Sequence, residues 1–378
     1  MLRFLRLRNF KCFSDQSFEL KALTLLSGLN GMGKSSLLQS LLLLRQSFQR
    51  GLLKEKIGLA LNGELIQIGN GKDVLFEKAQ TDKISIELKL ENGAEAQWHF
   101  NSDLEANVLN LDMAQYSEKI YSISLFKDNF QYLQAERLGP RSYFEMSDFD
   151  VRLHKRIGSK GEYALHYLSV LNEKNYLINP NLAHPSEKSF QIQLQIEAWM
   201  DEISPGTRMH FASYKGMNII DLEYSFEIEK DVGNRFRSAN VGFGITYTLP
   251  VLLSLLTSSS GSLILIENPE AHLHPSGQVK IGELAARAAA NGTQIILESH
   301  SDHVLNGIRL AVYDDIIAPE KVQLHYFERA TKENEGMVSI QSPKIDQNGR
   351  IDKWPEGFFD VWDNCLEALL KPKKVQVK

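Results

Sequence analysis

A short glycine-rich segment near the N-terminus constrains the fold of this chain more than any other feature. Residues 28–36 read GLNGMGKSS and match the pattern G-x-x-x-x-G-K-[ST] through Gly28, Gly33, Lys34 and Ser35. The segment follows an apolar strand and precedes a leucine-rich helix, which is the context that a phosphate-binding loop needs. The sequence therefore predicts an α/β nucleotide-binding fold. The alternative, a glycine-rich turn without a ligand, does not explain this placement.

The residue types in this loop suit ATP and Mg²⁺. Glycines let consecutive backbone N–H groups turn toward a phosphate, and the following helix adds its positive end. Lys34 is expected to reach the β- and γ-phosphates, and the Ser35 hydroxyl is expected to bind Mg²⁺. The predicted ATP-binding residues of the loop are Gly28, Asn30, Gly31, Gly33, Lys34, Ser35 and Ser36.

Two later segments resemble the other walls of such a site. Residues 261–270 read GSLILIENPE, in which four apolar residues lead to Glu267, a carboxylate placed to orient Mg²⁺. Residues 294–300 read QIILESH, and His300 is expected to contact the γ-phosphate. The alternatives are a solvated acid that ends a core strand and a surface histidine. A histidine metal cluster is disfavoured, because no cysteine or acid joins the histidines at metal-site spacing.

The rest of the chain divides by pattern. Short alternating runs with Asn-Gly turns indicate antiparallel strands, among them 84–90, 97–100 and 120–126, and residues 18–26 also form one predicted strand. After residue 240 the chain alternates between helix and strand. The predicted parts are a split ATPase head (1–56 and 231–330), an antiparallel β subdomain (57–130), a mixed and helical insertion (131–230) and a C-terminal extension (331–378).

Composition excludes several classes of protein. A net charge of −5 gives no basic field over the whole chain. The two cysteines, Cys12 and Cys365, have neither metal spacing nor a disulfide framework, which predicts a reducing, cytoplasmic compartment. No secretory signal is visible, and the apolar runs are shorter than the roughly 20 residues of a spanning helix, so no membrane association is expected.

The order of these motifs resembles the ABC-type ATPases of the RecF and SMC kind. It is more closely similar to the AAA-family OLD-type and Septu PtuA-like ATPases of prokaryotic defence systems. The resemblance is carried by LRLRNFKCFSD with the phosphate loop, by NVGFGITYTLPVLL, by ILIENPEAHLHP and by ILESHSDHVL, and it covers residues 57–230 poorly. It implies a P-loop NTPase with an ABC-ATPase-type head, in which helices flank a mixed central sheet.

The resemblance also implies roles for single residues. Glu267 takes the Walker B position, and Asn268 stands where many relatives carry the catalytic glutamate. His300 matches the switch histidine. The remaining matches are His274 in the D-loop, Gln134 as the Q-loop glutamine, and Asn240, Gly242, Phe243 and Gly244 in the signature loop, which contacts ATP held by a second subunit.

Asn268 is a departure with a chemical consequence. A side-chain amide has no proton affinity near neutral pH, so it cannot act as a general base. Glu270, two residues further on, is the nearest acid that could replace it. Hydrolysis is therefore expected to be slow, with Lys34, Glu267, Asn268, Glu270 and His300 as the catalytic set.

The leading hypothesis is an ATPase that dimerises, or forms a larger homo-oligomer, through its ATP sites and regulates a separate nuclease or toxin in anti-phage defence. No acid cluster of the Toprim type follows His300, so the effector is expected on another chain. One alternative is a RecF-like DNA-repair ATPase, and another is an ATP-bound scaffold with little hydrolysis. A transporter subunit is disfavoured, because the sequence LSGGQ is absent. The candidate nucleic-acid contacts are Arg3, Arg6, Arg8, Lys11, Arg235 and Arg237.

Overall fold

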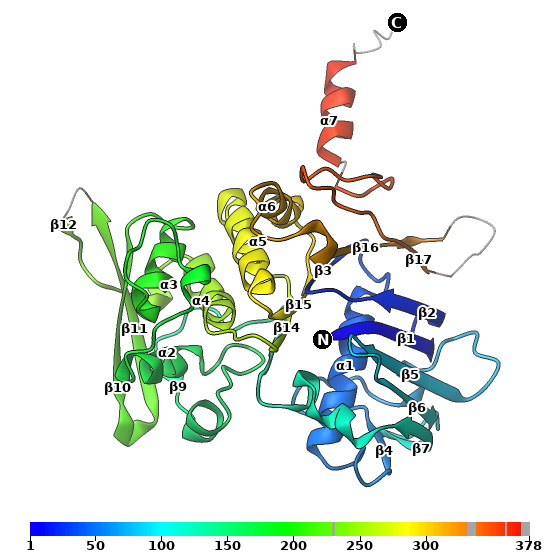
Figure 1. The fold of residues 1–378 in the computed structure, drawn as a ribbon. Coiled ribbons are helices and arrows are strands. Elements are labelled where there is room, and N and C mark those ends of the chain that lie inside the picture. The colour runs from blue at the N-terminus through cyan, green and yellow to red at the C-terminus, as the bar shows by residue number, and fades with distance from the viewer. Residues whose placement is uncertain (229–230, 331–337, 360, 372–378) are drawn as a thin grey trace, which may run out of the picture.

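A six-stranded sheet, predominantly parallel, forms the centre of the molecule (Figure 1). The computed structural model describes the chain except for residues 229–230, 331–337, 360 and 372–378. The strand order is β17-β16-β3-β15-β14-β8, and only β17 runs antiparallel to its neighbour. These strands are β3 (Leu23–Gly28), β8 (Phe130–Leu133), β14 (Leu263–Glu267), β15 (Gln294–Glu298), β16 (Val322–Arg329) and β17 (Val338–Gln341). Because the first five are parallel, their carboxyl ends meet at one edge of the sheet.

A second six-stranded sheet is antiparallel, in the order β2-β1-β5-β6-β7-β4. Its strands are β1 (Leu2–Phe10), β2 (Phe13–Glu19), β4 (Gly58–Ala60), β5 (Lys83–Leu90), β6 (Glu95–Asn101) and β7 (Val108–Tyr116). Gly93, with a φ of 81°, lies in the turn between β5 and β6, where an Asn-Gly pair was expected to reverse the chain. The sheet thus combines the first strands of the chain with strands from the predicted β subdomain.

Helix α1 (Lys34–Gln49) lies between these two sheets (Figure 1). Its leucines, from Leu37 to Leu44, are fully buried and share one core with β1, β5 and β6 and with Leu263, Leu265 and Ile296 of the central sheet. A helix covered on several sides carries apolar residues around most of its circumference, which explains why leucine occupies six of the eight positions from Leu37 to Leu44. The phosphate loop is therefore anchored to a helix that is packed into the core.

Two strand predictions in this region are wrong. Residues 18–26 do not form one strand, because the chain leaves the antiparallel sheet after Glu19 and enters the central sheet at Leu23. Residues 120–126 form two 3₁₀ turns, Glu118–Ser122 and Ser124–Phe126, instead of a strand. Tyr121 and Phe126 pack against Phe48 of α1, at ring-centroid distances of 4.9 and 4.8 Å, so these apolar residues serve helix packing and not a sheet.

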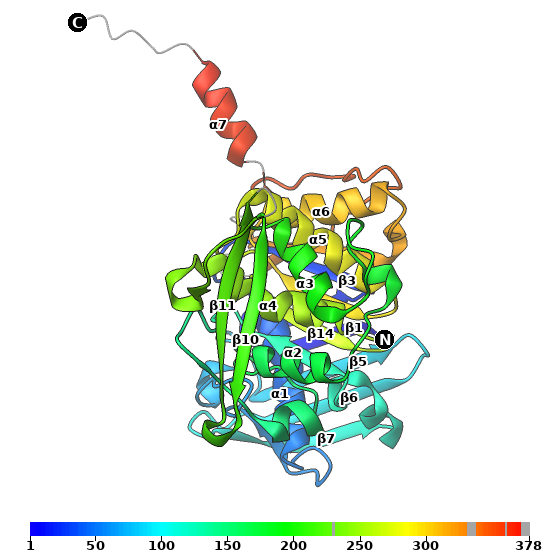
Figure 2. The same cartoon turned by 90° about the vertical axis from the view of Figure 1, so that its left-hand side faces the viewer.

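The insertion forms a separate layer. Its long hairpin of β10 (Thr207–Tyr214) and β11 (Ile219–Ile228) stands across α2 (Ala164–Glu173) and α3 (Ile192–Asp201), as Figure 2 shows. Three short strands also pair with β11, namely β9 (Phe144–Glu145), β12 (Asp231–Val232) and β13 (Phe236–Arg237). A shared core joins this layer to the three helices that return to the central sheet, α4 (Phe243–Leu256), α5 (Pro275–Ala290) and α6 (Asp302–Tyr313).

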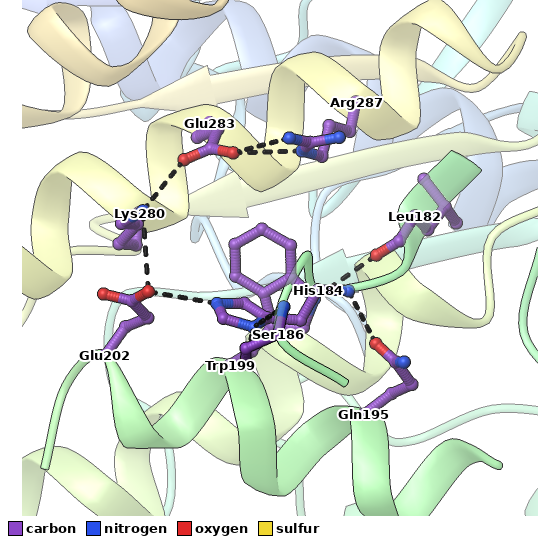
Figure 3. A network of polar contacts seen from close by, with 9 residues as sticks. All are labelled: Leu182, His184, Ser186, Gln195, Trp199, Glu202, Lys280, Glu283 and Arg287. Carbon is purple, nitrogen blue, oxygen red and sulfur yellow. Dashed lines mark hydrogen bonds and ion pairs between the residues drawn. The ribbon is translucent and has the colours of Figure 1, made fainter. Parts of the chain in front are cut away.

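A chain of polar contacts links the insertion to α5 (Figure 3). Glu202, just after α3, lies 3.0 Å from Nε2 of the buried His184 and 3.6 Å from the Lys280 ammonium group. Lys280 also contacts Glu283, which binds Arg287 at 2.8 Å. Because α5 directly follows the His274 segment, these contacts fix the insertion against a helix that begins near the predicted site.

The remaining elements are short or peripheral. A five-residue π-helical turn spans Phe149–Leu153, and 3₁₀ turns occupy Gly71–Asp73, Pro180–Leu182, Lys215–Met217, Ser238–Asn240 and Pro319–Lys321. Helix α7 (Val361–Leu370) extends away from the body of the protein (Figures 1 and 2). No helix in the described part of the chain has the length and apolar character needed to cross a membrane.

Candidate nucleotide-binding site

The phosphate loop joins the end of β3 to the start of α1, and three of its glycines have left-handed backbone geometry. Gly28, Gly31 and Gly33 have φ angles of 128°, 76° and 97°. A Cβ atom at Gly28 would lie 2.1 Å from the carbonyl oxygen of Phe327, and one at Gly33 would lie 2.4 Å from Sγ of Cys12. The loop conformation therefore requires glycine at these two positions on both backbone and steric grounds.

The Lys34 side chain folds back over this loop. Its Nζ atom donates hydrogen bonds to the carbonyl oxygens of Gly28 at 2.9 Å and Leu29 at 2.8 Å. Burial lowers the pKa of Lys34. The loop thus holds an ammonium group at the position where the motif predicts phosphate binding.

Two carboxylates end neighbouring strands at the edge of the sheet that carries the loop, and one of them contacts it. Glu267 ends β14, Glu298 ends β15, and the two residues are direct partners in the parallel register. The Ser35 hydroxyl donates to Oε1 of Glu298 at 3.0 Å. The Tyr132 hydroxyl donates to Oε1 of Glu267 at 2.9 Å, and the backbone N–H of Ala135 donates to its Oε2 at 3.3 Å.

Glu270 adds a third acid and connects the Glu267 segment to His300. Its Oε1 atom accepts a hydrogen bond from the backbone N–H of His300 at 2.8 Å. The His300 side chain reaches the surface, and burial together with the nearby Lys34 ammonium group lowers its pKa. The structure therefore brings Lys34, Glu267, Glu270 and His300 to one edge of the central sheet.

Several buried carboxyl groups lie together at this edge of the sheet, and their pKa values are raised. Burial raises the pKa of Glu267 and Glu270. Burial also raises the pKa of Glu298 to about 7, and the negative charges of Glu267 and Glu270 add to this effect. Asn268 Oδ1, Glu270 Oε2 and Glu298 Oε2 are the buried side-chain oxygens, among the residues described, that lack a hydrogen-bond partner. Since each such oxygen costs about 1–3 kcal/mol, the site favours an additional cation or donor.

Mg²⁺ fits this donor set. The ion prefers hard oxygen ligands and is commonly bound by one or two carboxylates together with substrate phosphates. Across the described residues, no three His, Cys, Asp or Glu side chains gather closely enough to hold a metal by themselves. A site in which the Ser35 hydroxyl and the carboxylates share the ion with ATP phosphates is consistent with both facts.

The buried Arg137 side chain binds backbone carbonyl groups of several segments around the site. Its side chain is 3% exposed and donates to the carbonyl oxygens of Glu267 at 2.7 Å and Asn268 at 2.6 Å. It also donates to the carbonyls of Gln134 at 3.0 Å and Tyr247 at 3.3 Å. Gln134 itself follows β8, one residue before the Ala135 N–H that binds Glu267. The backbone around the predicted Q-loop, the Walker B strand and α4 is therefore held by one guanidinium group.

The predicted signature residues lie elsewhere on the surface. Asn240 ends a 3₁₀ turn, Gly242 precedes α4, and Phe243 is 57% exposed. Gly244 packs so closely that a Cβ atom there would lie 2.5 Å from the carbonyl oxygen of His272. Within the described chain, no hydrogen bond or ring contact joins residues 240–244 to residues 28–36.

His274 has a structural position in this chain. It precedes α5 as its N-cap, and its Nδ1 accepts a hydrogen bond from the backbone N–H of Ser276 at 3.4 Å. Capping satisfies a helix N–H group that would otherwise lack a partner. The structure therefore shows a local role for His274 but does not place its side chain against the phosphate loop.

Three residues of this region were not identified from the sequence: Glu298, Arg137 and Tyr132. A signal for Glu298 was present, because QIILE, like LILIE, is an apolar strand that ends in a carboxylate. Arg137 and Tyr132 gave no comparable signal, since their partners are distant in sequence, at residue separations of 130 and 135.

Comparisons with known proteins agree with this architecture. Residues 23–306 match the family model described as "AAA domain, putative AbiEii toxin, Type IV TA system". Residues 317–369 match a model described as "Protein of unknown function (DUF3696)". A search of curated proteins finds no significant match.

Solved structures with a similar fold include two SMC heads. The SmcHead bound to the C-winged helix domain of ScpA is 13% identical, with 92% of this chain and 98% of that chain covered and a TM-score of 0.54. The Smc head domain with an extended coiled coil, derived from Pyrococcus furiosus and bound to the C-terminal domain of ScpA, is also 13% identical. In that comparison, 98% of this chain and 99% of the other chain are covered, and the TM-score is 0.52. The predicted fold class, a P-loop ABC-ATPase-type head with an antiparallel β sheet, is confirmed.

Proposed function

Because this chain belongs to the AAA-domain family that residues 23–306 match, we propose that it binds ATP with Mg²⁺, dimerises around the nucleotide and hydrolyses it. One observation carries the proposal. A glycine loop with Lys34 and Ser35 faces three acids at the edge of a parallel sheet, where buried oxygens lack partners. This combination suits a magnesium nucleotide better than a neutral ligand.

Different residues of the chain bind the phosphates, hold the metal ion and activate the attacking water. The loop N–H groups and Lys34 bind the phosphates and stabilise the charge that develops on the γ-phosphoryl group. Ser35 and Glu267 would hold Mg²⁺, which neutralises phosphate charge when bound. Glu270 accepts the proton of the attacking water, since its Oε2 has no partner in the described structure and burial raises its pKa. Asn268 orients this water by hydrogen bonding, and His300 contacts the γ-phosphate.

The dimer is proposed from the separation of the two halves of the site. The signature residues Asn240, Gly242, Phe243 and Gly244 would reach the ATP of a second subunit, with the D-loop around His274 and the Q-loop residue Gln134 completing each composite site. The exposure of Phe243, the first residue of α4, supports a role at an interface.

A separate protein partner is part of the proposal. The matched family is described through a toxin of a type IV toxin–antitoxin system, and both SMC heads are solved with domains of ScpA. These descriptions support an ATPase that signals to another chain. We therefore propose an OLD-type or Septu PtuA-like sensor and regulator of an effector in anti-phage defence.

The size of the protein with and without nucleotide tests the proposal. A non-hydrolysable ATP analogue with Mg²⁺ is expected to convert wild type to a dimer or larger species in light-scattering chromatography. Lys34→Ala is expected to abolish this change, whereas Lys188→Ala, at an exposed lysine, leaves it intact. A wild-type protein that binds no nucleotide, or whose size ignores it, would refute the proposal.

DNA binding is a second candidate, favoured by Arg235 and Arg237, which are exposed just before the signature residues. The edge formed by Arg6 and Arg8 is less suitable. Arg6 binds Asp15 at 2.6 Å, and Arg8 lies 3.3 Å from Glu87, so acids offset these charges. Phosphate contacts would make DNA affinity fall steeply with salt, which filter binding measures.

A further inference from the structure

Glu298 has a place in the site that the loop motif does not assign. It ends β15 beside Glu267 and accepts the Ser35 hydroxyl at 3.0 Å through Oε1. The residue is only 6% exposed, and its Oε2 atom is buried without a hydrogen-bond partner in the described structure. One oxygen is thus engaged by a predicted Mg²⁺ ligand, and the other is free.

A purely structural role does not account for this arrangement. A buried acid that only stabilises the fold would be expected to satisfy both of its oxygens, since an unpaired one costs free energy. The Lys34 charge lowers the pKa of Glu298, but the Lys34 ammonium group donates its hydrogen bonds to the carbonyls of Gly28 and Leu29. Glu267 and Glu270 add negative charge near the same place. Among the described residues, no cation is hydrogen-bonded to Glu298 Oε2.

We propose that Glu298 is a second metal-facing carboxylate of the nucleotide site and holds Mg²⁺ together with Ser35 and Glu267. The inference rests on the proposed ATP-binding function and extends it, because the motifs assign only Ser35 and Glu267 to the metal. Hydroxyl and carboxylate oxygens are the ligands that Mg²⁺ prefers. Glu298 acts either as a direct ligand or through a bound water, and both arrangements use its free oxygen.

This placement makes nucleotide binding depend on the metal. Without Mg²⁺, the Glu298 charge repels ATP phosphates, and with Mg²⁺ it contributes to binding. Glu298→Gln keeps an oxygen that can accept the Ser35 hydroxyl but removes the charge. The variant is therefore expected to bind ATP less well with Mg²⁺ and equally well or better in EDTA.

The experiment measures the affinity for nucleotide with Mg²⁺, the affinity for nucleotide in EDTA, and the dissociation constant of Mn²⁺. A fluorescent methylanthraniloyl derivative of ATP is titrated into each protein with Mg²⁺ and with EDTA. Mn²⁺ binding to the nucleotide complex is followed by electron paramagnetic resonance. Glu298→Gln is expected to weaken Mn²⁺ binding about 10–100-fold, the usual effect of losing an outer or second carboxylate at a metal site. Glu105→Gln, at an exposed glutamate, is the matched control and leaves all three values unchanged.

Several outcomes separate the possibilities. Equal loss of affinity with and without metal, or unchanged Mn²⁺ binding, overturns the role of Glu298. A wild type that binds no nucleotide in either buffer overturns the proposed function instead. If Glu298→Gln does not fold, Glu298→Asp, whose carboxylate is one methylene further back, is expected to weaken Mn²⁺ binding by a smaller factor. An unaltered Mn²⁺ constant for Glu298→Asp then contradicts the proposal.

Discussion

Asn268 shows how one residue alters the chemistry expected at the site. Its backbone has a φ of 45°, a left-handed conformation that asparagine tolerates better than most residues. Its side-chain oxygen has no partner within the described chain, and its amide cannot accept a proton near neutral pH. The same local turn presents the Glu270 carboxylate to the backbone of His300. These positions support the proposal that Asn268 orients the attacking water and Glu270 acts as the base.

The first prediction concerns this base. Glu270→Gln is expected to lower the steady-state rate of ATP hydrolysis by about 10²–10⁴-fold, the usual contribution of a general base. Nucleotide affinity should change little, because Glu270 does not belong to the phosphate loop. Phosphate release and nucleotide titration measure the two quantities. A turnover equal to that of wild type would show that Glu270 does not replace the missing glutamate.

The second prediction concerns pH and stability. Burial raises the pKa of Glu298 from its ordinary value of 4.5 to about 7 in the folded protein. The folded state therefore holds this proton more tightly, and its stabilising effect is lost as pH rises through about 7. Glu298→Gln removes this loss. Between pH 4 and pH 8, the free energy of unfolding of wild type is therefore expected to fall by up to about 3 kcal/mol more than that of the variant.

Urea unfolding of both proteins at the two pH values, without nucleotide or metal, measures this difference. Glu105→Gln serves again as the control, because it replaces an exposed glutamate. If the free energy of unfolding changes equally between the two pH values in wild type and Glu298→Gln, Glu298 does not cause the loss of stability.

At the scale of elements, the segment that follows β8 connects the two halves of the site. Arg137 in this segment binds carbonyl oxygens of β14 and α4, while Gly139 lies under the ring of Phe243. The contacts in Figure 3 make a comparable link between α3 and α5, but they are more exposed. Exposed ion pairs contribute little, so the buried Arg137 is the stronger of the two connections.

The third prediction tests this connection. Arg137→Ala leaves several buried carbonyl oxygens without donors and is expected to lower the free energy of unfolding by about 3 kcal/mol or more. Arg141→Ala, four residues further on and exposed, serves as the control with an expected change below about 0.5 kcal/mol. Urea denaturation gives both values. Similar small losses for the two variants would contradict a bracing role for Arg137.

At the scale of the whole molecule, the phosphate loop and the proposed signature residues lie in two separate regions of the chain. The phosphate loop is anchored by α1 between two sheets, whereas residues 240–244 lie at the start of α4 beside the insertion. A head-to-tail pair of chains would place each region opposite the other in its partner. Such an arrangement makes each ATP site a product of two subunits.

The fourth prediction follows from this division. Lys34→Ala and Asn240→Ala are each expected to lose ATP hydrolysis, and an equimolar mixture is expected to regain part of the wild-type activity. A mixed dimer contains one site in which both Lys34 and Asn240 are intact, and this site can still bind ATP between the two subunits. Hydrolysis assays on the mixture measure the recovery. A mixture as inactive as its components would place both residues in the same subunit's site.

Local patterns were sufficient for part of this protein. The glycine loop, α1, β14 and β15 were predicted correctly. Residues adjacent in the sequence specify both the phosphate-loop motif and the alternation of buried strands with helices. Patterns failed at 120–126, where apolar residues serve packing against Phe48, and at 18–26, where the chain changes sheets without a break in hydrophobicity. Neither error involved the residues that carry the predicted chemistry.

Tertiary structure decided what these residues face. The sequence alone identified Lys34, Ser35, Glu267 and Glu270, because their neighbours in the chain define the motifs. The position of Glu298 against Ser35 and of Arg137 against Glu267 depends on pairings across 263 and 130 residues. The parallel pairing of β15 with β3 brings Glu298 to Ser35, and that of β14 with β8 brings Glu267 to Arg137. A register between distant strands is a property of the packed sheet that no local segment specifies.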